Sequence, residues 1–197
     1  MPIYEFEGIR PVIDSTAYVH PTAVIIGDVI IGAMCFIGPC AVIRGDVGRL
    51  IVGNGTNIQD GCIVHSFPGE DTVIAEDGHI GHGAVIHGCT IGKNSLIGMN
   101  SVVMDGAEVG ESCIVGAMSF VKAAQVIPPR SLAAGSPAKI IRSLREEEIA
   151  WKSEGTDTYK YLAKRHAQTT KECEPLSEVE IDRARVPQTS HGPKHKQ

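Results

Sequence analysis

Aliphatic side chains recur every six residues through most of the first 121 positions. The period holds within four runs, which are separated by steps of nine residues after 43, ten after 64 and five after 86. So short a period is typical of a solenoid in which every coil repeats the same few strand positions. We therefore predict stacked short strands. The 18 aliphatic positions are Ile13, Val19, Ile25, Ile31, Ile37, Ile43, Val52, Ile58, Val64, Ile74, Ile80, Ile86, Ile91, Ile97, Val103, Val109, Val115 and Val121.

The positions around each aliphatic residue fit a narrow interior with tight turns. Four residues later the side chain is usually small, and one residue later glycine is frequent. With three repeats to a coil, this pattern predicts about six triangular coils of a parallel β-helix, with rungs roughly 4.8 Å apart. The longer steps predict loops at corners. Cys35, Cys62 and Cys113 occupy small positions, and we interpret them as packing residues rather than nucleophiles.

The recognisable six-residue repeat ends at Val121 and is followed by segments of different composition. Residues 126–139 predict a turn-rich closing segment. A capping-box pattern beginning at Ser143 predicts a helix to about His166 that packs on the β-helix. The polar tail from Lys171 is interpreted as disordered or as lying along a neighbouring subunit. The expected organisation is a β-helix over 1–140, a helical segment over 141–170 and a polar tail over 171–197.

Composition narrows the class of protein further. The chain holds 23 Ile and 18 Val against 6 Leu, which favours a mostly β fold. A net charge of -5 without a basic stripe argues against a nucleic-acid partner. No apolar run approaches the roughly 20 residues of a membrane-spanning helix, and no signal peptide is evident, so we expect no membrane association and a cytoplasmic location. Six cysteines without a CxxC pair are typical of reduced thiols.

Four repeats carry a functional side chain at the position where glycine is frequent, namely Arg44, Gln59, His65 and His87. If the loops preserve the phase of the triangle, Arg44, His65 and His87 stack in one column, one rung apart. Two imidazoles about 4.8 Å apart at the backbone can reach a single metal at roughly 2.0 Å. Because neutral imidazole is a common zinc ligand, the column predicts a zinc site, for which iron or cobalt are alternatives.

His82 belongs to the preceding face and should lie around a corner from the column. Within one chain the three imidazoles do not easily converge, but in a parallel trimer one subunit's preceding face can abut its neighbour's column. Gln59 and Asp60 share the face of His82 and would meet the same interface. The other histidines fit no column with partners, and we expect turn, surface or tail roles for them: His20, His79, His166, His191 and His195.

These residues resemble a known family. Arg44-Gly45-Asp46, Asn57-Ile58-Gln59-Asp60, His65, His82 and His87 look like the γ-class carbonic anhydrases over about residues 10–140. Nearly the whole chain is also similar to two related subfamilies, the phenylacetic acid degradation protein PaaY and the carnitine operon protein CaiE. The resemblance implies a left-handed β-helix, a homotrimer and a zinc ion held by three histidines at each subunit interface.

The resemblance also implies roles for single residues. It matches His65, His82 and His87 to the zinc ligands, Arg44 and Asp46 to an interface ion pair, and Gln59 and Asp60 to residues that orient substrate and zinc-bound water. It also places Asn57 and Tyr159 against substrate, although the local sequence alone favours a packing role for Tyr159. The chain departs from the family in two places. Val47 stands where the founding enzyme has glutamate, and the loop 66–73 is too short for its acidic proton-shuttle loop, for which Glu70 is a weak substitute.

The resulting hypothesis is a zinc enzyme whose zinc-bound hydroxide attacks carbon dioxide or the carbonyl of a coenzyme A thioester. The residues leave two other classes open. Hexapeptide β-helices often act as acyltransferases that use acyl-coenzyme A and one histidine as general base, which needs no metal. The third class is an accessory protein of a carnitine or coenzyme A pathway, in which zinc would be structural.

Overall fold

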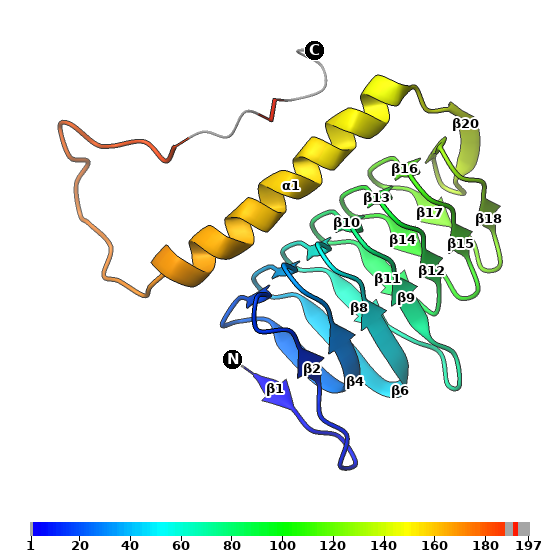
Figure 1. The fold of residues 1–197 in the computed structure, drawn as a ribbon, viewed down its shortest axis with the longest axis horizontal. Helices are drawn as coiled ribbons and strands as arrows, with labels where there is room; N and C mark the ends of the chain where they lie inside the picture. Colours follow the sequence, from blue (N-terminus) through cyan, green and yellow to red (C-terminus); the bar gives the residue numbers. More distant parts are fainter. Residues whose placement is uncertain (1, 188–190, 193–197) are drawn as a thin grey trace.

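The computed structural model describes residues 2–187 and 191–192, which form a three-sided parallel β-helix with a long helix along one side (Figure 1). The first sheet contains β1 (Ile3–Tyr4), β2 (Val12–Ile13), β4 (Val24–Ile31), β6 (Val42–Val52), β8 (Ile63–His65), β9 (Thr72–Ile74), β11 (Val85–His87), β12 (Thr90–Ile91), β14 (Val102–Val103), β15 (Glu108–Val109), β17 (Phe120–Val121) and β18 (Val126–Ile127). The second contains β3 (Tyr18–Val19), β5 (Phe36–Ile37), β7 (Asn57–Ile58), β10 (His79–Ile80), β13 (Leu96–Ile97), β16 (Ile114–Val115), β19 (Ser131–Ala134) and β20 (Lys139–Ser143).

The two sheets make three faces. Face 1 carries β9, β12, β15 and β18, face 2 carries β8, β11, β14 and β17, and face 3 is the second sheet. The long strands β4 and β6 turn the corner between faces 2 and 1, since β6 pairs with β8 near its start and with β9 near its end. All of these pairings are parallel except that of β19 with β20, in agreement with the predicted left-handed β-helix.

The six-residue period places its aliphatic side chains inside the coils. Ile37, Ile58 and Ile80 follow one another on face 3 in register, and each is fully buried. Cys35 and Cys62 are buried beside them, and burial raises the pKa of both thiols to about 11. A thiol that stays protonated near neutral pH is a poor nucleophile, so the predicted packing role is confirmed.

The β-helix has one coil more than predicted. On face 3, seven strands from β3 to β19 stack in parallel among the described residues. Ile127 pairs beside Val109, and Ala133 beside Val115, so the six-residue phase continues past Val121. The periodic pattern did not reveal this last coil, because proline replaces glycine after Ile127 and Ala133 stands where a larger aliphatic residue is usual.

The two long steps in the period have different structures. The step after Val64 is a loop between β8 and β9, as predicted. The step after Ile43 is not, because residues 44–51 continue as strand within β6. The extra residues are absorbed at the corner, where the pairing of β4 with β6 shifts register between Gly27 and Val29.

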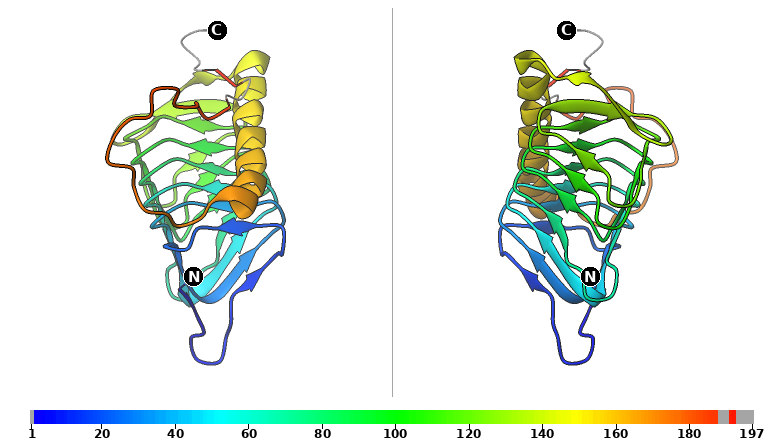
Figure 2. Two further views of the ribbon diagram at one scale, coloured as in Figure 1. Left: turned by 90° about the vertical axis from the view of Figure 1, so that its left-hand side faces the viewer. Right: turned by 90° about the vertical axis from the view of Figure 1, so that its right-hand side faces the viewer.

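The helix α1 (Glu146–Thr169) runs along face 3 against β3, β5 and β7 (Figure 2). Its predicted start at Ser143 is wrong, because β20 extends through that residue. The backbone N–H of Arg145, which precedes the helix, donates to the Glu148 carboxylate at 3.0 Å, and this contact closes the first turn. Within the described residues, α1 is not apolar enough to span a membrane.

Among the described residues of the tail, 170–187 form no helix or strand, and 191–192 contact α1. His191 lies with its ring centroid 5.2 Å from that of Trp151, and the Trp151 indole N–H donates to the Gly192 carbonyl at 2.9 Å. His191 is thus near α1 of its own chain, whereas a course along a neighbouring subunit stays a prediction. His195 lies outside the described residues.

Candidate functional site

The predicted column of face 2 is formed by adjacent strands. His65 ends β8 and His87 ends β11, and the two residues are register partners. Arg44 follows Ile43, which is the register partner of Val64, so it lies one rung before His65. The Nδ1 atom of His65 is 3.1 Å from Nε2 of His87. Two of the three predicted metal ligands are therefore adjacent, as the six-residue phase predicted.

Carboxylates hold the other nitrogen of each imidazole. The Nε2 atom of His65 is 2.9 Å from Oδ1 of Asp46, and Nδ1 of His87 is 2.5 Å from Oδ1 of Asp105. Because an ionised carboxylate only accepts, both of these nitrogens carry the proton of the neutral ring. The two nitrogens that face each other are then both acceptors. Such a contact is repulsive unless a proton or a cation lies between the rings.

This arrangement fits a zinc site. Two nitrogens bound to one tetrahedral zinc ion at about 2.0 to 2.1 Å lie about 3.4 Å apart, close to the separation found between His65 and His87. Metal-binding histidines usually donate their second N–H to a carboxylate, which fixes the tautomer. Asp46 and Asp105 have that position. Asp105 was not among the predicted site residues.

The predicted pair of Arg44 and Asp46 is also formed. Arg44 donates to the second oxygen of the Asp46 carboxylate, whose first oxygen accepts from His65. Burial acts to raise the pKa of Asp46, but the hydrogen bonds from His65 and Arg44 outweigh it and lower that pKa. The carboxylate is thus ionised near neutral pH and keeps the His65 ring in one orientation.

His82 lies apart from this pair, as its place on face 3 predicted. Its Nδ1 atom is 2.5 Å from Oδ2 of Asp60, so Nε2 is left as an acceptor, and both side chains are about half exposed. Within residues 2–187 and 191–192 of one chain, no group of three metal-ligating side chains comes together. Of the three histidines predicted as ligands, two are thus adjacent in a single copy, whereas His82 lies on face 3.

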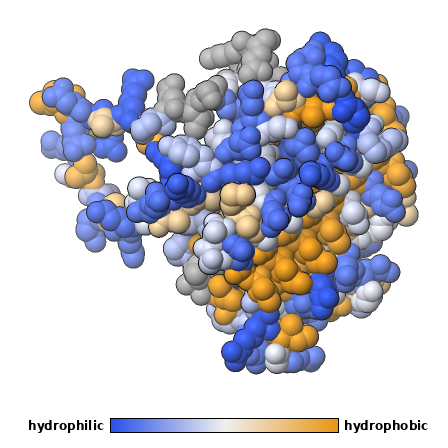
Figure 3. All heavy atoms as spheres, in the orientation of Figure 1, coloured by the Kyte–Doolittle hydropathy of each residue, from blue (hydrophilic) through white to orange (hydrophobic). Residues whose placement is uncertain are grey.

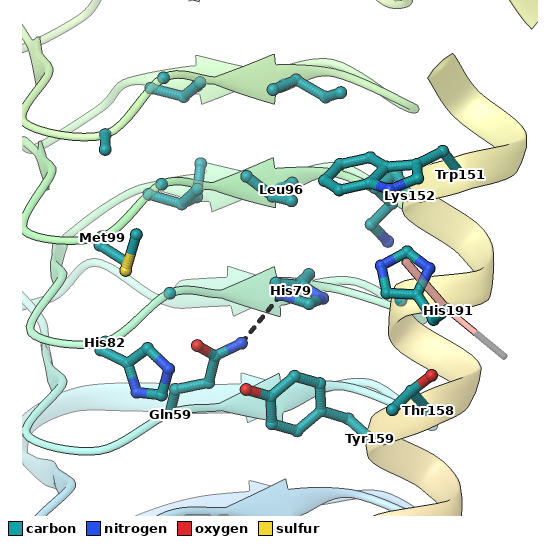
Figure 4. A pocket seen from close by; sticks show the side chains of 18 residues that line it. Gln59, His79, His82, Leu96, Met99, Trp151, Lys152, Thr158, Tyr159 and His191 are labelled. Carbon is teal, nitrogen blue, oxygen red and sulfur yellow. Dashed lines mark hydrogen bonds between the residues drawn. The ribbon is translucent and has the colours of Figure 1, made fainter. Parts of the chain in front are cut away.

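A cavity of about 450 Å³ lies between face 3 and α1, and His82 is at one end of it (Figure 4). Gln59 and Tyr159, to which the resemblance assigns roles at the site, line the same cavity. The Gln59 amide nitrogen donates to Oδ1 of Asn57 at 2.9 Å and to Nε2 of His79 at 2.8 Å. Its oxygen is turned toward His82 (Figure 4). Since the amide N–H groups are engaged, Gln59 offers the cavity an acceptor.

Tyr159 brings a donor to the cavity from α1. Its hydroxyl points toward Gln59 in Figure 4. Burial, assisted by the charge of Asp60, raises the pKa of Tyr159 to about 12. The phenol therefore stays protonated near neutral pH and can donate to an oxygen beside His82.

Two residues in this region escaped the sequence reasoning. His79 was assigned a turn or surface role, which is wrong, because its ring contacts Gln59 and lies 3.2 Å from the Asn57 amide. Burial, together with the nearby charges of Lys152, His191 and His82, lowers the pKa of His79 to about 3. The signal was available, since Asn57 and His79 are separated by 22 residues, as are His65 and His87.

Lys152 is the second residue that was missed. It is 2 % exposed, and its ammonium donates to the Asp77 carbonyl at 2.5 Å and to Oδ1 of Asn94 at 2.8 Å. Burial lowers its pKa to about 7. The contacts join α1 to the turns of the β-helix, and no periodic signal could have placed a helix residue there.

Known proteins share both the sequence and this fold. The profile of the bacterial transferase hexapeptide family (six repeats) matches residues 88–123. Carnitine operon protein CaiE of Salmonella agona (strain SL483) is 51% identical over 190 residues, which cover 96% of each chain, and CaiE of Proteus sp. (strain LE138) is 53% identical over 186 residues, 94% of each. The chain belongs to the hexapeptide-repeat family of CaiE. Among solved structures, a hexapeptide transferase family protein from Anaplasma phagocytophilum has a TM-score of 0.81 at 39% identity, over 84% of this chain and 98% of its own.

Proposed function

We propose that this chain forms a metal-dependent hydratase or thioester hydrolase whose metal lies between two copies of the chain. His65 and His87 of one copy and His82 of the next would hold the ion, with zinc as the expected metal. The observation that carries the proposal is the pair of imidazole acceptors on His65 and His87, which two carboxylates hold 3.1 Å apart. An ion between them would replace repulsion with coordination.

The third ligand is assigned to another copy because His82 faces a different surface. Its ring is held by Asp60 and about half exposed, which suits approach by a second chain. In a cyclic homotrimer each copy offers both surfaces, so three equal sites form. Exposed apolar residues such as Val12 and Ile63 would supply contact area. Figure 3 shows apolar side chains gathered over the strands, whereas the exposed surface of α1 is polar.

The cavity residues suit attack by water on a carbon–oxygen double bond. A bound zinc ion supplies a Lewis acid and lowers the pKa of water to roughly 7. Gln59 would accept a hydrogen bond from the attacking water, and Tyr159 would donate to the substrate oxygen. With carbon dioxide, the water oxygen bonds to carbon and a proton leaves, which gives bicarbonate. With a thioester, the same oxygen bonds to the carbonyl carbon, the C–S bond breaks, and a carboxylate and a thiol are formed.

Acyl transfer is the second candidate, and the comparisons favour it by name more directly than they favour a zinc enzyme. One relative is called a hexapeptide transferase family protein, and CaiE is named for a carnitine operon, which also fits an accessory role. His82, paired with Asp60, would act as general base. It would take the proton of an amine or alcohol, whose nitrogen or oxygen attacks the thioester carbonyl while the thiol leaves.

Metal analysis combined with parallel assays separates these functions. We expect a trimer in native mass spectrometry with up to three zinc ions, and hydration of carbon dioxide or hydrolysis of aryl-coenzyme A thioesters that chelation abolishes and zinc restores. Acyl transfer by metal-free protein would support the second candidate. Metal without any of these activities would support an accessory role, and a metal-free monomer would contradict the proposed centre.

A further inference from the structure

We propose that the cavity between α1 and face 3 binds the acyl chain of a thioester substrate, with the carbonyl end at His82 and Gln59. The inference rests on the proposed function and names its substrate class as thioesters of medium-length, uncharged acyl groups. Carbon dioxide needs no such space. The volume of about 450 Å³ lies in the range, roughly 300 to 1,000 Å³, of pockets that bury small organic ligands.

The lining of the cavity fits an apolar guest. Leu96, Met99 and Ile114 project into it from the β-helix, and Trp151 projects from α1. Among the residues that the structure describes, Lys152 supplies the one buried ammonium at the far end of the cavity. The N–H groups of this ammonium donate to Asp77 and Asn94. Apolar contact therefore dominates along the length of the cavity, which favours a hydrocarbon chain over a sugar or a phosphate.

The polar groups that the proposed reaction would use lie at the opposite end. In Figure 4, His82, the Gln59 oxygen and the Tyr159 hydroxyl lie at one side, whereas Trp151 and Lys152 lie at the other. A chain that occupied the apolar part would thus place its carbonyl beside the groups that the reaction needs. The substrate would be oriented by the place of its acyl chain along the cavity, and no charged group would need to recognise that chain.

The wall formed by α1 and the returning tail is closely fitted. Gly155 lines the cavity within the helix, where glycine is less favourable than alanine. A Cβ atom there would lie 3.1 Å from Nε2 of His191, which in turn packs on Trp151. The absence of a side chain at Gly155 thus leaves room for His191, which lines the cavity as well.

The single tryptophan of the chain gives a direct binding signal, because Trp151 lines the cavity. We would titrate the full-length protein with the octanoyl and acetyl thioesters of N-acetylcysteamine, with metal removed so that hydrolysis does not interfere. The octanoyl thioester should change Trp151 fluorescence at concentrations more than about a hundredfold lower than the acetyl thioester, because each buried methylene adds to affinity. Equal response to both probes, or none, would overturn the inference.

Leu96 and Leu132 provide a matched pair of variants. Both are half-buried and lie in one outward-facing column of face 3, but only Leu96 lines the cavity. Leu96→Phe should weaken octanoyl binding at least about tenfold, while Leu132→Phe should leave it unchanged. Leu96→Ala widens the cavity and should shift the preference toward decanoyl. Equal octanoyl affinity in all three variants would contradict the assignment.

The two proposals fail in distinguishable ways. If Leu96→Phe weakens octanoyl binding but the zinc-loaded protein hydrolyses no thioester, acyl binding in the cavity is supported and the proposed reaction is contradicted. Zinc-dependent hydrolysis of acetyl and octanoyl thioesters at equal rates, with no response from Trp151, retains the reaction and contradicts the cavity.

Discussion

The Nδ1 atom of His65 and the Nε2 atom of His87 lie 3.1 Å apart as two facing acceptors. Neither ring can turn away freely, because Asp46 holds the far nitrogen of one and Asp105 holds the far nitrogen of the other. The β-helix sets the spacing, since these residues are register partners on adjacent strands. A cation bound as proposed would therefore meet two imidazoles whose positions are already set by the fold.

Removing an orienting carboxylate should weaken the site without removing a ligand. In Asp105→Ala, the His87 ring loses the acceptor that fixes its tautomer, so we expect zinc affinity to fall roughly 10- to 100-fold. Competition against a chromophoric chelator measures this affinity. Glu108→Ala, which removes an exposed carboxylate on β15, is the control. Unchanged affinity in Asp105→Ala would mean that Asp105 does not orient a metal ligand.

The periodicity predicted the parts of the site that depend on the rungs of the solenoid. Asp60 and His82 are separated by the same 22 residues as His65 and His87, and each pair forms a contact between neighbouring coils. The same spacing could have identified His79 as the neighbour of Asn57. Asp105 follows Val103 by two residues, as His82 follows Ile80, and it lies 18 residues after His87, so the period could have identified it as well.

The cavity could not be predicted in this way. A six-residue period fixes which side chains face inward, but it does not fix where a separate helix packs on the outer surface. The positions of Trp151, Lys152 and Tyr159 over face 3 follow from contacts between α1 and strands that are far away in the sequence. The contact of Lys152 with Asp77 and Asn94 is of this kind.

Stability at acid pH should depend on His79. Its pKa in the folded protein is about 3, below the value of 6.5 of an unfolded histidine. Below pH 6.5 the unfolded chain takes up a proton that the folded chain does not, so this residue's stabilisation is complete above pH 6.5 and is lost as the pH falls toward 3. The slope for one proton is about 1.4 kcal/mol per pH unit.

Urea unfolding of the wild type and His79→Asn between pH 3.5 and 8 tests this linkage. The difference in unfolding free energy should shift in favour of His79→Asn as the pH falls, whereas His20→Asn, at a turn away from the cavity, should keep the dependence of the wild type. Parallel curves for the wild type and His79→Asn would show that His79 takes up its proton equally in both states.

Hydration of carbon dioxide, where it is measurable, should be limited by export of protons. Val47 is 40% exposed on β6 but cannot carry a proton, and the loop between β8 and β9 is short. Concentrated imidazole buffer should therefore raise the steady-state rate, because the buffer replaces the missing shuttle. Stopped-flow assays at constant ionic strength measure this. A fast rate that is independent of buffer would show that another group exports the proton.

The sharing of each site between two copies is open to a direct test with two inactive variants. One lacks His82, and the other lacks both His65 and His87, so neither homotrimer contains a complete site. A mixed cyclic trimer always has one junction at which the intact halves meet. After equal amounts are unfolded and refolded together, roughly three quarters of the trimers are mixed with one good site in three, and activity should return to about a quarter of the wild-type value. Zinc content gives a second measure that does not depend on the reaction. If native mass spectrometry detects mixed trimers but neither activity nor tightly bound zinc returns, the three histidines do not share an interface.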